Sequence, residues 1–241
     1  MMRTSHSSDR TDRYSVLRSQ PNRQFSSCER FDIAVMKETI LLVELEMQEF
    51  CIDLRALSNI VLSDLGATLQ VLRLAGREYG GDDVRPLRME DCIASLGVDA
   101  CLDAMSLSFM LLDSRSKAVA GLWSHSREIA VHSKRLADQT LDVDPDQAYL
   151  VGLCHAIGSL ESLMGRGAKA RQAPDLPRVG LELAREWSLP SCVVDYFSDL
   201  EMYGGRSSWV GIVQAAHRAA DGTPSEWASR NEIHPQMLWA V

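Results

Sequence analysis

One stretch of the sequence, residues 122–160, constrains the fold more than any other. It is typical of two helices with a short break between them, and the second is apolar almost all the way round. A helix without a polar face is usually buried, so other helices have to cover it. The first helix carries His125 and His132, seven residues apart and therefore on one helical face. His155 lies within the second, so two histidine-bearing helices are expected to face each other.

Helical periodicity continues on both sides of this pair. No stretch alternates apolar and polar residues over the length of a strand, so no strand is predicted. Short helices joined by short loops indicate an all-α domain. The further helices are predicted over about 33–50, 53–62, 64–79, 88–96, 98–112, 179–187, 190–197 and 207–220.

The two ends of the chain differ from its middle. Residues 1–32 are rich in Ser, Arg and Asp and lack apolar periodicity, so they are predicted to form a disordered N-terminal tail. This tail is expected to be a solvated leader or a misassigned start; the alternative is a basic arm that binds an anionic surface or a partner. Residues 33–222 form the predicted helical domain. Residues 223–241 end on the apolar sequence LWAV and form either a packed helix or a truncated continuation of the domain.

Composition narrows the class of protein. The net charge of -8 and the pI of about 5.3 disfavour nucleic acid as the main partner, because phosphate binding needs a basic face. No apolar run reaches the length of a membrane span, and the N-terminus has no apolar core of a secretory signal. The six cysteines form no CxxC pair, which favours a reduced cytoplasmic protein.

Four motifs along the chain carry a family resemblance. They are SDLGATLQVLRLAG at 63–76, RMEDCIASLG at 88–97, LWSHSREIA at 122–130 and QAYLVGLCHAIGSL at 147–160. In order and spacing they resemble the HDOD domain, a degenerate branch of the HD and HD-GYP metal-dependent phosphohydrolase superfamily. Within them, Asp64, Arg73 and Trp123 match the family signature. The resemblance implies a multi-helix orthogonal bundle of the HD-superfamily type.

The resemblance also bears on catalysis. An active HD hydrolase holds its metal with a His, an adjacent His-Asp pair and a distant Asp. By resemblance, His125 corresponds to the first His and His155 to the His of the pair. Ala156 stands where the pair has its Asp, and His217 falls near the distant Asp. We interpret these four positions as a vestigial HD-type site that contains no catalytic residue.

The three histidines allow two interpretations. The favoured one is packed core histidines left from an ancestral site, with no bound metal and no cofactor. The alternative is a three-histidine zinc site with one open position. For Asp64, Arg73 and Trp123, the favoured roles are helix cap, member of a buried ion pair and core aromatic. A conformational or partner-contact role is the alternative.

The resemblance implies a function in bacterial signal transduction. We expect a non-catalytic regulatory module that binds other signalling proteins. One alternative is a divergent metal-dependent phosphohydrolase acting on nucleotides or cyclic dinucleotides. Another is a nucleotide-sensing module without turnover. No membrane partner is expected, and a homo-oligomer is an open possibility.

Overall fold

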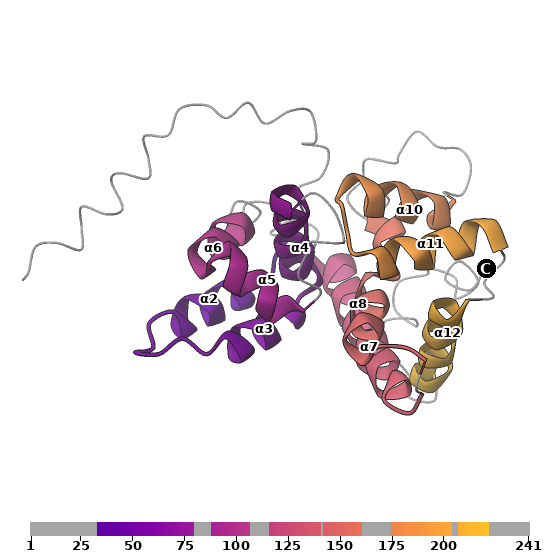
Figure 1. Ribbon diagram of the computed structural model, residues 1–241, viewed down its shortest axis with the longest axis horizontal. Coiled ribbons are helices and arrows are strands. Elements are labelled where there is room, and N and C mark those ends of the chain that lie inside the picture. The colour runs from indigo at the N-terminus through magenta and orange to yellow at the C-terminus, as the bar shows by residue number, and fades with distance from the viewer. Residues whose placement is uncertain are drawn as a thin grey trace, which may run out of the picture. The chain divides into compact units, whose positions relative to one another are not determined.

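The computed structural model is helical wherever it describes regular secondary structure (Figure 1). The all-α prediction is therefore confirmed. The predicted tail, the predicted C-terminal segment and the end of the helix expected to reach residue 112 lie outside the described residues. These are 33–79, 88–106, 116–140, 142–160, 175–203 and 207–221.

The first five described helices pack against one another, and local sequence explains where they begin and end. The carboxylate of Asp53 accepts hydrogen bonds from the backbone N–H groups of Arg55 and Ala56, so Asp53 is the N-cap of its helix. Gly97 closes another helix with a φ of 87°, a conformation that favours glycine. The five helices are α2 (Lys37–Glu46), α3 (Leu54–Leu62), α4 (Leu65–Tyr79), α5 (Met89–Leu96) and α6 (Val98–Ser106).

Helix α2 is shorter at both ends than the predicted span of 33–50. Residues 33–36 are not helical, and Met36 has an extended backbone. Its N–H donates a hydrogen bond of 2.7 Å to the carboxylate of Asp64. Residues 33–35 are fully or almost fully buried, so the apolar pattern that predicted a helix belongs instead to an extended segment. A tertiary contact decides this boundary, and helical periodicity alone could not show it.

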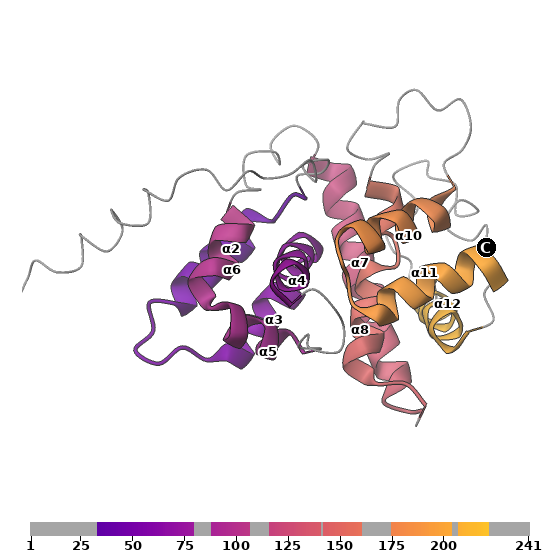
Figure 2. The same cartoon turned by 45° about the horizontal axis from the view of Figure 1, so that its top comes forward.

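The second group of helices is organised around α7 and α8, the pair predicted from the central stretch (Figure 2). Helix α8 is covered by α7, α11 and α12, as its lack of a polar face requires. The group comprises α7 (Ser116–Ala137), α8 (Pro145–Cys154), the 3-10 helix η3 (Ile157–Ser159), α10 (Leu176–Glu186), α11 (Ser191–Tyr203) and α12 (Ser208–Asp221).

Helices α7 and α8 approach each other closely at Gly152. A Cβ atom at this position would lie 2.8 Å from the Cα of Ala130 and 3.0 Å from the carbonyl oxygen of Ile129. Real side chains do not tolerate such distances to backbone atoms, so the contact depends on glycine. This close approach sets the separation between the two helices that carry His125 and His155.

Candidate functional site

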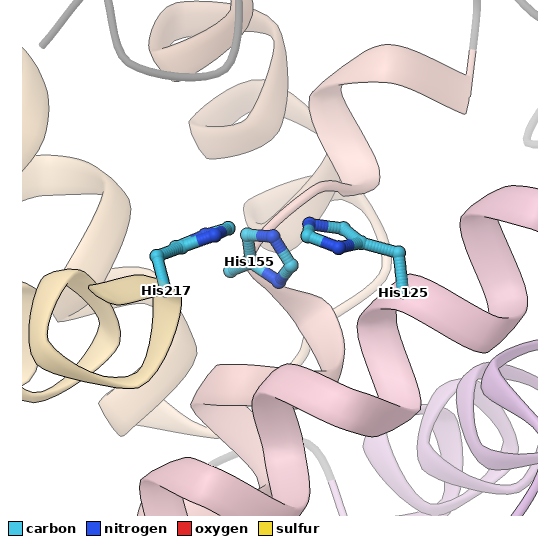
Figure 3. A group of neighbouring side chains, drawn as sticks. All are labelled: His125, His155 and His217. Atoms are coloured by element: carbon cyan, nitrogen blue, oxygen red, sulfur yellow. The ribbon is translucent and has the colours of Figure 1, made fainter. Parts of the chain in front are cut away.

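The structure brings together the three histidines of the predicted vestigial site (Figure 3). Their ring centroids lie 5.2 Å apart for His125 and His155, 5.1 Å for His125 and His217, and 4.8 Å for His155 and His217. One ring nitrogen from each lies within 4.8 Å of the other two. All three side chains are buried, with exposed fractions of 7%, 9% and 8% in chain order.

Each histidine comes from a different helix. His125 lies on the buried face of α7, His155 is the C-cap of α8, and His217 lies one turn before the end of α12. Helix α12 packs against both α7 and α8, and this packing places His217 beside the other two rings. His132, on the same face of α7, is half-buried and is not a member of the cluster.

The ring orientation of His155 is set by a hydrogen bond within its own turn. Its Nδ1 lies 2.7 Å from the carbonyl oxygen of Gly152. A carbonyl oxygen only accepts, so Nδ1 carries the proton. In the neutral ring, Nε2 then carries a lone pair. This Nε2 is buried and has no hydrogen-bond partner among the residues that the structure describes.

Burial keeps two of the three rings neutral. Desolvation lowers the pKa of His155 well below its ordinary value, and the neighbouring rings of His217 and His125 lower it further. The hydrogen bond to Gly152 acts in the opposite direction and is the smaller effect. Desolvation lowers the pKa of His217 to about 4. At neutral pH, His155 and His217 therefore present uncharged imidazoles.

The chemistry of the cluster follows from its donor set. Imidazole nitrogens suit zinc and other late transition metals, whereas magnesium and manganese prefer oxygen ligands. Among the side chains that the structure describes, no carboxylate belongs to the cluster. Ala156, next to His155, is buried and offers neither a ligand nor a base. The arrangement can hold a metal, but it lacks the mixed His and Asp set of the active HD site.

Asp64 and Trp123 form a second buried polar contact, outside the histidine cluster. Asp64 is 2% exposed and accepts a 2.7 Å hydrogen bond from the indole N–H of Trp123. It also accepts backbone hydrogen bonds from Gly66 and Ala67 at the start of α4, and from Met36. Asp64 thus caps α4 and connects it to both the extended segment and α7.

Arg73 has a partner that the sequence did not indicate. Its side chain is buried, and the guanidinium carbon lies 5.3 Å from the centre of the Trp187 ring, a cation–π distance. From its sequence match, Arg73 is expected in a buried ion pair, and no role is expected for Trp187. Trp187 follows α10 and lies in none of the four motifs, so no local pattern connects the two residues.

Comparison with known proteins gives a family and a fold. Residues 34–173 match the family model of the HDOD domain. The match includes His125 and His155 and ends before His217. No match was found among curated proteins. None of the helices in the described part of the chain is long and apolar enough to cross a bilayer.

Two solved structures of the MmoQ response regulator from Methylococcus capsulatus str. Bath are similar. One has a TM-score of 0.63 and 19% identity and covers 87% of this chain and 98% of its own. The other is a fragment with a TM-score of 0.61 and 20% identity, and the match covers 79% of this chain and 84% of the fragment. At such identities the likeness shows the fold alone. Because the family match spans residues 34–173, more than half of its length, this chain belongs to the HDOD domain family.

Proposed function

We propose that this HDOD domain is a non-catalytic regulatory module that acts by binding another protein. The observation that carries the proposal is the donor set of the histidine cluster. It combines three imidazoles with Ala156, and no described carboxylate belongs to it. MmoQ, whose fold this chain shares, is a response regulator, which agrees with a regulatory role for this chain.

The donor set argues against hydrolysis of phosphate esters. Metal-dependent hydrolases use the metal to activate water and to stabilise negative charge on the phosphoryl oxygens. Magnesium and manganese need oxygen ligands that neutral imidazoles do not supply. A general base also has to lie within hydrogen-bond reach of the attacking water. The methyl group of Ala156 cannot fill that role.

Helix α2 presents the surface that we propose for partner binding. Leu41, Leu42 and Leu45 share one helical face and are 52%, 48% and 59% exposed. Glu38 and Glu44 are exposed beside them. Adjacent large apolar side chains on a surface are typical of interaction sites. The leucines and glutamates together are called the α2 face below.

The charges on the α2 face indicate what kind of partner fits it. A second copy docked symmetrically would bring Glu38 and Glu44 of one chain close to the same residues of the other. Like charges across an interface suppress association. We therefore propose a different protein, whose contact surface combines apolar side chains with Lys or Arg.

A turnover assay tests the non-catalytic part of the proposal. Phosphomonoesters, nucleotides and cyclic dinucleotides are incubated with the protein and with magnesium, manganese or zinc. We expect no hydrolysis above that of a His155→Ala control. Turnover that both His125→Ala and His155→Ala abolish would contradict the proposal and favour a divergent phosphohydrolase. Saturable nucleotide binding without turnover would favour a nucleotide sensor instead.

Site-specific photo-crosslinking tests the α2 face. A photoreactive residue at Leu45 is compared with one at Val131, which is 52% exposed on α7 and serves as the matched control. We expect a crosslink from Leu45 alone, to partner peptides that contain Lys or Arg. Glu38→Lys and Glu44→Lys should weaken it. A crosslink only to a second copy, or equal crosslinking from Val131, would contradict the proposed surface.

A further inference from the structure

We propose that His125, His155 and His217 bind one transition-metal dication, preferably zinc, which ties α7, α8 and α12 together. The sequence alone favours packed histidines without a metal, whereas the geometry of the cluster points to a metal site. This inference does not rest on the proposed protein-binding role. A metal held by three neutral imidazoles can be structural in a module that has no catalytic activity.

The strongest evidence is the state of His155. Its side chain is more than nine-tenths buried, and no group in the described part of the chain forms a hydrogen bond with its Nε2. Leaving a polar atom buried and unsatisfied costs free energy that packing does not recover. The same ring donates from Nδ1 to the carbonyl of Gly152. Metal-binding histidines commonly use such a bond to fix the ring and leave the other nitrogen for the metal.

The spacing of the three rings is close to that of a filled site. Their potential ligand atoms all lie within 4.8 Å of one another. With Zn–N distances of about 2.0–2.1 Å and tetrahedral angles, ligand nitrogens lie about 3.3–3.4 Å apart. The ligand nitrogens therefore have to approach one another by about 1.4 Å at most to bind a zinc ion. Figure 3 shows the three rings gathered in one group, and their centroid distances of 5.2, 5.1 and 4.8 Å place them at the corners of a triangle.

The backbone around the cluster also favours a cation. His155 is the C-cap of α8, and His217 lies one turn before the C-terminal end of α12. The C-terminal end of a helix carries partial negative charge, which stabilises a nearby cation.

Three imidazoles leave the fourth position of a tetrahedral zinc ion for water or a small anion. The site that we propose therefore uses three protein ligands.

Metal binding is tested on the full chain, prepared without a polyhistidine tag and stripped with chelator. The protein is dialysed against zinc chloride, and bound zinc is measured by mass spectrometry. We expect about one zinc ion per chain, since three histidines make one site. Zinc affinity should fall at least about tenfold in each of the three variants His125→Gln, His155→Gln and His217→Gln. Substitution of residues that only support the metal ligands already costs about tenfold, so loss of a ligand should cost at least as much.

His132→Gln is the matched control, because His132 lies on α7 outside the cluster. This variant should keep the affinity of the wild type. Circular dichroism in chelator shows whether each variant is folded. Zinc content well below one equivalent in the wild type would overturn the proposal. An equal loss of affinity in His132→Gln would overturn it too.

X-ray absorption spectroscopy of the zinc-loaded wild type gives a test that needs no variant. Three imidazole scatterers around zinc would support the site. Cysteine sulfur ligands, or oxygen ligands alone, would place the metal elsewhere and overturn the proposal. The cobalt-substituted protein should show the intense visible absorption of tetrahedral coordination. The weak spectrum of hydrated cobalt would contradict it.

Discussion

The contact between α7 and α8 can be tested by replacing Gly152 with alanine. The added Cβ atom would lie 2.6 Å from the hydroxyl oxygen of Ser133 and 2.8 Å from the Cα of Ala130. The hydroxyl can rotate away, but the backbone of Ala130 cannot. The two helices therefore have to separate. Because His125 lies on α7 and His155 lies at the end of α8, the histidine cluster has to widen when the helices separate.

Two opposing effects set the change in the free energy of unfolding of Gly152→Ala. Overpacking a tight core typically costs about 1–3 kcal/mol. Alanine is a better helix former than glycine, which offsets about 1 kcal/mol in a helix interior. We expect Gly152→Ala to lower the free energy of unfolding by about 1–2 kcal/mol, since the backbone contact favours the upper part of the packing range. Its zinc affinity should fall as well.

Gly211→Ala is the matched control. Gly211 lies in α12 and is exposed, and none of the described residues has an atom within 4 Å of where its Cβ would be. The free energy of unfolding of this variant should rise by about 0.5–1 kcal/mol, because alanine has a higher helix propensity than glycine. Urea denaturation of both variants and the wild type, followed by circular dichroism, gives the comparison. If Gly152→Ala were also stabilising, the close approach of α7 and α8 would be refuted.

Three further measurements test the buried polar groups and the core. Burial lowers the pKa of His217 to about 4, so the unfolded chain binds more protons as the pH falls, and stability is lost from about pH 7 downward. Between about pH 7.5 and about pH 5, the free energy of unfolding of the metal-free wild type should therefore fall by about 2 kcal/mol more than that of His217→Gln. Equal losses in the two proteins would contradict a lowered pKa for His217. Trp123→Phe removes a donor to buried Asp64 and should cost about 1.5–3 kcal/mol in urea denaturation; a negligible loss would contradict a buried hydrogen bond. Leu153→Ala should cost about 2–5 kcal/mol, whereas half-buried His132→Ala should stay within about 0.5 kcal/mol.

The parts of the fold that depend on local sequence could be predicted. Asp53 begins a helix and Gly97 ends one, because capping requires only residues that are neighbours in the chain. The burial of α8 also follows from its composition, since a helix without a polar face has nowhere else to go. These features combine backbone chemistry with apolar pattern, and both are visible in a single sequence.

Contacts between distant segments could not be predicted in the same way. The start of α2 depends on the hydrogen bond from Met36 to Asp64, which no periodicity reveals. The position of the Arg73 guanidinium over Trp187 depends on how their two segments pack. For the histidine cluster, the resemblance indicated which residues to consider. The distances between their rings come from the packing of three helices.

The features of the cluster that argue against hydrolysis are compatible with the proposed metal site. If Ala156 corresponds to the Asp of the HD pair, as the resemblance implies, the site has neither that oxygen ligand nor that base, both of which phosphate chemistry uses. Zinc does not require either, because neutral imidazoles are among its usual ligands. In the proposed zinc site, His217 supplies the third nitrogen from α12. The proposed metal would hold three helices together without hydrolysing phosphate esters, and it would leave the α2 face to the proposed partner.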